Sequence, residues 1–312
     1  MTEFTEYLRR NCPVCGSARS SKVVARSKRT AEEMDFPSLV PHWNGFFKEK
    51  VYFSYVRCHG CGLVYAPIFF NPHQLEKLYG QMPPNMVEVP LAALRRTQSG
   101  YFDTLASCCP LTGGFIEVGP DIGLFTDFCS RKGNFREFWL FEPNCDVKAQ
   151  LSRTVTGKKY QIIHEMFDFA RVPDESASVA VMIHVLDHLI NPVQALQELR
   201  KKLVSGARLL LVTHDESSLL RRVVGWRWPA FCLQHPQLYS PSTIRNLLAK
   251  AGYRVILSRK TTNHFQVGFL VRHLLWAFGF KADFGSGFGQ TTIGLKLGNI
   301  LTVATPAEGD HL

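Results

Sequence analysis

The chain has 312 residues and carries 36 Lys and Arg against 26 Asp and Glu, a formal net charge of +10. Its length can hold two packed units, and its 46% hydrophobic and 20% charged composition excludes a mostly disordered protein. No apolar run approaches the roughly 20 residues of a bilayer span, since Arg272 and His273 interrupt the run at 269–280. Residues 1–6 lack the basic stretch and apolar core of a secretory signal, so we expect a cytoplasmic protein.

Two cysteine pairs mark the first part of the chain. Cys12 and Cys15 form one C-x-x-C-G motif, and Cys58 and Cys61 form a second. Four thiolates at the corners of a tetrahedron are the ligands of a closed structural zinc site, and the glycine after each pair lets the backbone turn toward the sulfurs. We therefore expect a zinc-binding unit over residues 1–70, with these four cysteines as metal ligands. Four unrelated buried thiols, or a redox dithiol, are the alternatives.

The rest of the chain changes from helical to alternating patterns. We expect a helical linker or cap over 71–110, with helices at 74–79 and 91–107. Over 111–312, short β-branched or aromatic runs alternate with helical stretches, which is typical of βαβ units. The expected strands are 115–119, 137–142, 160–167, 178–184, 208–214, 254–258 and 300–304, and the expected helices are 124–132, 191–203 and 241–251. An aromatic- and glycine-rich insertion at about 261–297 is expected to hold a helix at 269–280. The fold class is α/β, a Rossmann-like doubly wound, mostly parallel sheet with a small N-terminal zinc-binding unit.

A glycine turn follows the first strand of this region. Residues 115–118 are an apolar strand apart from Glu117, and Gly119 and Gly123 belong to the turn that opens the next helix. Such a turn lets a nucleotide-like ligand approach the backbone at the carboxyl edge of a sheet. Glu142 ends the next strand, where an acid can accept hydrogen bonds from ribose hydroxyls. A tight βα turn beside a solvated acid is the alternative.

These residues resemble a known family. The segment E-V-G-P-D-I-G at 117–123 looks like the E-x-G-x-G-x-G loop of class I S-adenosylmethionine-dependent methyltransferases, and H-V-L-D-H-L-I-N-P at 184–192 looks like their H-V-L-E-H-x-x-D-P segment. Residues 199–209 are similar to their L-x-R-x-L-K-P-G-G-x-L, and residues 235–253 to a following H-x-x-x-F-S-P…L-L-x-x-A-G-F pattern. The N-terminal part resembles that of bacterial sugar C-methyltransferase-type proteins, in which C-x-x-C-G-L precedes a proline and an L-x-x-L-Y helix.

The resemblance implies S-adenosylmethionine as the cofactor and a structural zinc ion. The cofactor-binding residues expected on this basis are Glu117, Gly119, Pro120, Asp121, Gly123, Glu142, Pro143, Phe167, Asp168 and His184. Two positions depart from the family pattern: Asp121 replaces the middle glycine of the loop, and Ser178 stands where the family has an aspartate. These departures motivate a non-catalytic, methyltransferase-like binding or adapter protein as an alternative.

Methyl transfer to a sugar carbon or hydroxyl also needs a general base near the methyl group. The catalytic candidates are His188, His214 and His235, and the substrate-binding candidates are Tyr79, Arg222, Trp228 and Tyr239; a packing role is the alternative for each. The basic and aromatic run at 220–229 suits a substrate lid, a nucleic-acid patch or an amphipathic surface helix.

The preferred function is C- or O-methyl transfer to a sugar or a nucleotide- or lipid-linked sugar metabolite, purely through the family resemblance. The alternative within enzymes is an RNA methyltransferase. We expect a monomer or homodimer that uses a small-molecule substrate and has no membrane span.

Overall fold

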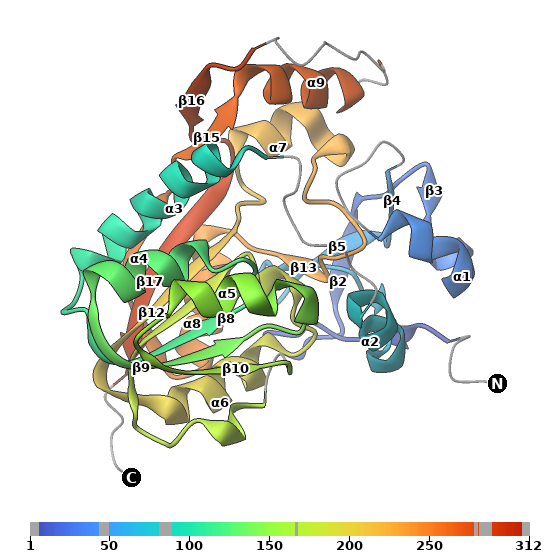
Figure 1. The fold of residues 1–312 in the computed structure, drawn as a ribbon. Coiled ribbons are helices and arrows are strands. Elements are labelled where there is room, and N and C mark those ends of the chain that lie inside the picture. The colour runs from blue at the N-terminus through green and yellow to red at the C-terminus, as the bar shows by residue number, and fades with distance from the viewer. Residues whose placement is uncertain are drawn as a thin grey trace.

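A seven-stranded sheet forms the centre of the protein (Figure 1). The structure is a computed structural model, and it describes residues 6–43, 50–80, 89–165, 168–277, 280 and 289–307. The strand order is β10-β9-β8-β11-β12-β17-β14. The strands are β8 (Thr112–Val118), β9 (Asn134–Phe141), β10 (Lys159–Ile163), β11 (Ala177–Ile183), β12 (Leu203–His214), β14 (Tyr253–Lys260) and β17 (Asn299–Pro306). The five strands from β10 to β12 are parallel, and β17 pairs antiparallel with both β12 and β14. The prediction of a mostly parallel α/β sheet is therefore confirmed.

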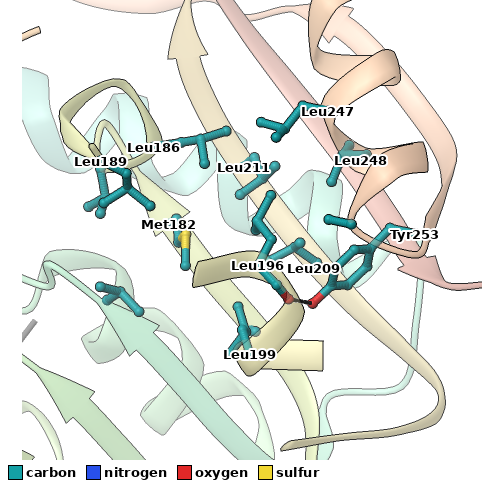
Figure 2. Packing of buried hydrophobic residues seen from close by; sticks show 14 of the residues in the cluster. Met182, Leu186, Leu189, Leu196, Leu199, Leu209, Leu211, Leu247, Leu248 and Tyr253 are labelled. Atoms are coloured by element: carbon teal, nitrogen blue, oxygen red, sulfur yellow. Dashed lines mark hydrogen bonds between the residues drawn. The ribbon is translucent and has the colours of Figure 1, made fainter. Parts of the chain in front are cut away.

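Helices cover both faces of this sheet. Side chains alternate along each strand, so Phe115 and Val181 pack in the core under α3 (Leu91–Ala106), α4 (Leu124–Lys132) and α5 (Lys148–Thr154). Ile116 and Met182 belong to the opposite core, under α6 (Pro192–Lys202) and α8 (Pro241–Lys250). Figure 2 shows this second core, in which the buried Tyr253 hydroxyl donates to the carbonyl of Leu196 at 2.9 Å. This alternation makes the sheet doubly wound.

Local sequence signals account for most element boundaries. Helix α4 spans the residues predicted for it, and α8 begins at Ser240, whose side chain and that of Thr243 form a reciprocal capping box. Pro192 occupies the first turn of α6 after Asn191, as predicted. Strand β10 is shorter than the predicted 160–167, because the chain leaves the sheet at His164.

The N-terminal part forms a small second layer of structure beside the large sheet. Its elements are β1 (Leu8–Arg9), β2 (Ser20–Ala25), β3 (Arg29–Thr30), α1 (Phe36–Leu39), β4 (Val51–Tyr52), β5 (Tyr55–Cys58), β6 (Val64–Tyr65), β7 (Ile68–Phe69) and α2 (Pro72–Gly80). A four-stranded sheet, β13-β6-β5-β2, includes β13 (Gln237–Leu238) from the far end of the chain. Residues 224–238 share one core with this N-terminal part, in which Tyr52 and Phe231 stack at 5.7 Å.

The predicted insertion forms a hairpin and a helix at one end of the molecule. Strand β15 (Asn263–Gln266) pairs with β16 (Thr292–Leu295), and α9 (Val267–Ala277) follows β15 directly. Helix α7 (Leu219–Val224) lies at the same end of the molecule in Figure 1. Within the described residues, no helix is long and apolar enough to cross a membrane.

Candidate functional site

The glycine loop lies at the carboxyl end of β8, where the strand order changes direction between β8 and β11. Gly119 and Gly123 adopt φ angles of 69° and 78°, which L side chains rarely take. A Cβ on Gly119 would lie 2.6 Å from a Val185 methyl group, so the loop also passes too close to its neighbour for a side chain. Glu117 is 2% exposed and accepts the Thr126 hydroxyl at 2.5 Å; burial raises the pKa of Glu117 to about 8.

Asp121 occupies the position at which the family has its middle glycine. Its φ of 51° shows that the backbone keeps the left-handed turn although the residue has a side chain. Its N–H donates to Glu142 Oε2 at 2.8 Å, and the N–H of Asn144 donates to Glu142 Oε1 at 2.9 Å. Burial and the neighbouring Glu142 carboxylate raise the pKa of Asp121 to about 7. The loop and the second strand are therefore joined through the carboxylate of Glu142.

Four histidines gather beside this loop. His184 follows β11 and His214 ends β12, so both lie at the same carboxyl edge as Gly119 and Glu142. The ring centroids of His184 and His214, of His214 and His235, and of His235 and His188 are each 4.8 Å apart. The three residues predicted as catalytic candidates thus lie in one cluster with His184.

Asp187 orients His214 through two contacts. Its Oδ2 lies 2.7 Å from His214 Nδ1 and accepts the backbone N–H of His214 at 3.0 Å. Although burial raises the pKa of Asp187, the hydrogen bonds from His214 outweigh burial and the net pKa is lowered. Burial lowers the pKa of His214, against the opposing effect of Asp187. An ionised Asp187 beside a neutral His214 places the imidazole proton on Nδ1 and leaves Nε2 as a proton acceptor.

His235 carries the opposite charge preference. Its Nδ1 lies 2.8 Å from the carbonyl oxygen of Ala230 and 3.3 Å from Sγ of Cys232. Burial alone would lower the pKa of His235, but the Cys232 thiolate outweighs it and raises the pKa to about 9. His188 is neutral, because burial lowers its pKa well below the usual range, and its Nδ1 lies 3.2 Å from the Tyr79 hydroxyl. One cationic and several neutral imidazoles therefore stand side by side.

The remaining predicted site residues occupy different settings. Trp228 and Tyr239 are buried, and the Trp228 ring lies 6.3 Å from the ring of His214. Arg222 is exposed on α7, and Asp168 is exposed and accepts the Ala170 N–H at 3.1 Å. Phe167 lies outside the described residues. Pro120 is buried in the loop, and Pro143 follows Glu142 at the end of β9.

The four predicted metal ligands lie together at one end of the N-terminal sheet. The Sγ atoms of Cys12 and Cys61 are 3.5 Å apart, those of Cys15 and Cys58 are 3.4 Å apart, and all four sulfurs lie within 4.8 Å of one another. Sulfurs of a tetrahedral zinc site are about 3.8 Å apart, which follows from Zn–S bonds of about 2.3 Å. Gly16 and Gly62, which follow the two pairs, have φ angles of 76° and 80°, as the motif predicts. The residues therefore fit a zinc ion.

Contacts from the N-terminal part support the segment that carries His235. The hydroxyl of Tyr55 donates to the His235 carbonyl at 2.6 Å and to the Cys232 carbonyl at 3.1 Å. Arg57 forms a two-point ion pair with Glu216, at 2.8 and 3.0 Å. The two residues of each contact are between 159 and 180 positions apart in the sequence.

Sequence reasoning missed three residues that contact the histidine cluster, which are Asp187, Cys232 and Asn299. Asp187 was compared with the family pattern but was not expected to hold His214, and Cys232 was assigned no role. The Nδ2 of Asn299 lies 3.4 Å from His184 Nε2 and comes from the last strand. No local motif marks Cys232 or Asn299, because each meets its histidine only through the fold.

Comparisons with known proteins extend these observations. Residues 93–258 match the model of a family described as a methyltransferase domain. No curated protein matches the sequence significantly. Among solved structures, a SAM-dependent methyltransferase from Leishmania major is similar with a TM-score of 0.50 and 12% identity, over 74% of this chain and 81% of that one. The YcgJ protein from Bacillus subtilis has a TM-score of 0.47 and 17% identity over 68% of this chain and 99% of its own. Magnesium protoporphyrin IX methyltransferase from Synechocystis, with bound SAH, has a TM-score of 0.46 and 13% identity over 75% and 92%. At these identities the likeness is one of fold.

Proposed function

The chain belongs to the methyltransferase domain family, and we propose that it transfers a methyl group from S-adenosylmethionine to a sugar or a sugar-containing, nucleotide- or lipid-linked small molecule. S-adenosylmethionine supplies an electrophilic methyl carbon on a sulfonium sulfur. The residues that would hold it are the glycine loop at 119–123 and Glu142, which lie together at the carboxyl ends of β8 and β9, the edge at which sheets of this kind bind nucleosides.

The histidine cluster supports the chemical step. An acceptor hydroxyl or acidic C–H must lose a proton as it attacks the methyl carbon. We assign this proton to Nε2 of His214, since Asp187 holds the Nδ1 proton and burial lowers the pKa of the ring, which favours its neutral form. The cationic His235, 4.8 Å from His214 between ring centroids, would stabilise the negative charge that develops on an acceptor oxygen. The single observation that carries this proposal is the 2.7 Å contact between His214 and Asp187 beside the glycine loop.

We also propose a structural zinc ion at the four cysteines. The donor set is four sulfurs with no histidine, carboxylate or open position among them, which suits stability and not catalysis. Its role is to hold the N-terminal part whose tyrosine and arginine side chains contact the segment of His235.

The function is tested in two steps. Calorimetry on the zinc-loaded protein measures S-adenosylmethionine binding, for which we expect micromolar affinity; a folded protein that does not bind it would support the adapter alternative and refute the enzyme. Methyl transfer is then measured with tritium-labelled methyl on a panel of nucleotide-linked and polyprenyl-linked sugars.

The matched variant is His214→Gln, which should reduce transfer by about 10²- to 10⁴-fold and leave cofactor affinity within a few-fold. Transfer that persists in this variant would remove His214 as the base.

The RNA alternative has weaker support, since Trp228 is 3% exposed and cannot stack on a nucleobase in this structure. Salt-sensitive RNA binding with methyl incorporation into RNA would reverse that preference.

A further inference from the structure

The net charge of this protein is confined to one part of the sequence. Residues 217–282 contain 10 Lys and Arg and no Asp or Glu, which leaves 26 basic and 26 acidic residues in the rest of the chain. The whole excess of +10 therefore lies in the segment that includes α7, α8, β14 and α9. Arg221 and Arg222 of this segment belong to α7 and Arg272 to α9, and such basic residues favour an anionic partner.

Helix α7 presents an apolar face to the solvent within this segment. Leu219 and Val223 are four residues apart, so they lie on the same side of the helix, and they are 72% and 71% exposed. Arg222, between them in sequence, is also exposed. The arrangement is the reverse of a surface helix that packs its apolar face inward, because only Val224 of α7 is buried.

Helix α9 and the residue that follows it add to this surface. The helix contains no acidic residue, and its Leu274 is 52% exposed. Phe280 is 66% exposed, and its N–H donates to the Leu275 carbonyl at 2.9 Å, which holds it at the end of the helix. Exposed apolar side chains next to basic residues are typical of helices that lie in a membrane interface.

The two helices belong to the same end of the fold, next to the candidate site. Ser218, the N-cap of α7, lies against Gly298, whose carbonyl accepts the Asp215 N–H at 2.7 Å. Gly298 follows β16, the partner of the strand that leads into α9. Figure 1 shows α7 and α9 at the top of the molecule. Because α7 begins five residues after His214, this surface borders the histidine cluster.

We propose that Leu219, Arg222 and Val223 of α7, together with Leu274 and Phe280 at the same end of the fold, dock onto an anionic lipid bilayer. Apolar side chains enter the headgroup boundary, and the arginines of α7 and α9 are attracted to negative headgroups. Helix α9 has 11 residues and is too short to span the bilayer, so the protein lies on the surface. A second copy of this chain fits less well, because two faces of the same positive charge would repel each other across an interface.

Docking has a consequence for the substrate that rests on the proposed function. A lipid-linked acceptor would be presented at the bilayer surface, and the start of α7 is five residues along the chain from His214. Docking therefore favours a lipid-linked sugar over a free or nucleotide-linked sugar as the methyl acceptor.

The test is co-sedimentation of the full zinc-loaded protein with vesicles of phosphatidylcholine alone or with 30% phosphatidylglycerol. We expect binding to the anionic vesicles that weakens as salt is raised. The double variant Leu219→Asp with Val223→Asp should bind at least tenfold more weakly, and its control is Val23→Asp, an exposed apolar residue on β2. Arg222→Gln should weaken binding about fivefold, and Arg153→Gln on α5 should not.

Three results would overturn the proposal: no binding of the folded protein to anionic vesicles, equal binding by the α7 double variant and the Val23 control, or a dimer in ultracentrifugation that the double variant dissociates. S-adenosylmethionine calorimetry on the double variant separates this proposal from the function, because docking should be lost while cofactor affinity is unchanged. Vesicle binding without any cofactor binding would refute the function and leave the docking surface intact.

Discussion

The two halves of the candidate site are built in different ways. The glycine loop and Glu142 come from neighbouring strands close in sequence, and their contact runs from the Asp121 N–H to Glu142 over 21 residues. The histidine cluster draws on the ends of β11 and β12, on the segment before β13, and on Tyr79 of α2, which is 109 residues from its partner His188. The first half needs only two neighbouring strands, with the turn and helix between them. The second needs the N-terminal part to be in place.

This difference predicts that the two halves fail separately. Loss of the N-terminal part removes the support of Tyr55 and Arg57 from the segment of His235, while the side chains of β8 and β9 that face α3, α4 and α5 keep their core. Cofactor binding should therefore survive damage that abolishes methyl transfer.

The largest expected effect is that of Cys58→Ser. Removing one of four thiolate ligands should abolish zinc binding and lower the free energy of unfolding of the N-terminal part by about 4 kcal/mol or more. Metal analysis, thermal unfolding and the methyl-transfer assay measure it, with Cys145→Ser at an exposed position as the control. Unmutated protein without zinc, or loss of cofactor binding together with transfer, would contradict the separation of the two halves.

The variant Asp187→Asn tests the histidine half of the site. The amide keeps an acceptor for the backbone N–H of His214 but loses the charge, so transfer should fall about 100-fold. Since Asp187 raises the pKa of His214 against the effect of burial, its loss should lower that pKa further. Activity rises with pH as His214 loses its proton, so this limb of the kcat/KM profile should move to lower pH. A fall in kcat with an unmoved limb would assign Asp187 a structural role only.

Glu142→Gln is the matching change on the cofactor side. The proposed role of Glu142 is to accept hydrogen bonds from the ribose hydroxyls, and a side-chain amide replaces one of the two acceptor oxygens by an NH2 group, so we expect a cost of about 2 kcal/mol or roughly 30-fold in cofactor affinity. Calorimetry measures this loss. Glu137→Gln on the same strand, paired with exposed Lys159, is the control and should change affinity less than twofold. Equal losses in both variants would show that Glu142 does not contact the cofactor.

Asp121→Asn has the smallest expected effect, and its sign depends on pH. Because the pKa of Asp121 is raised from 3.8 to about 7 in the folded protein, ionisation opposes folding: the stability present below pH 4 is lost as the pH rises toward 7. The neutral amide should therefore stabilise the protein by about 1–2 kcal/mol at pH 8, after allowance for solvent screening, and by almost nothing at pH 4. Denaturant unfolding at both pH values measures it, and a gain independent of pH would refute the electrostatic cause.

Much of the fold could be read from local patterns because those patterns act through nearest neighbours. Helix α4 and the capping of α8 follow from residues within one or two turns, and the alternation along β8 and β11 indicates a sheet covered on both faces. The strand pairing of β13 with β6 could not be predicted, since it joins residues 237–238 to residues 64–65 through two-residue strands without a periodic pattern. The exposed apolar face of α7 was also not predicted, since the sequence does not show which side of a six-residue helix is covered.

The sequence by itself determined the chemistry that is available: two cysteine pairs, a glycine turn followed by an acid, and histidines after the strands of a parallel sheet. Only the tertiary structure decided which of these groups meet. It paired His214 with Asp187, gave His235 a thiolate neighbour in Cys232, and placed the N-terminal part against the segment between them. The physical reason is that covalent spacing controls contacts within a turn or between consecutive strands, whereas contacts across 100 or more residues form only where packed cores bring two surfaces together.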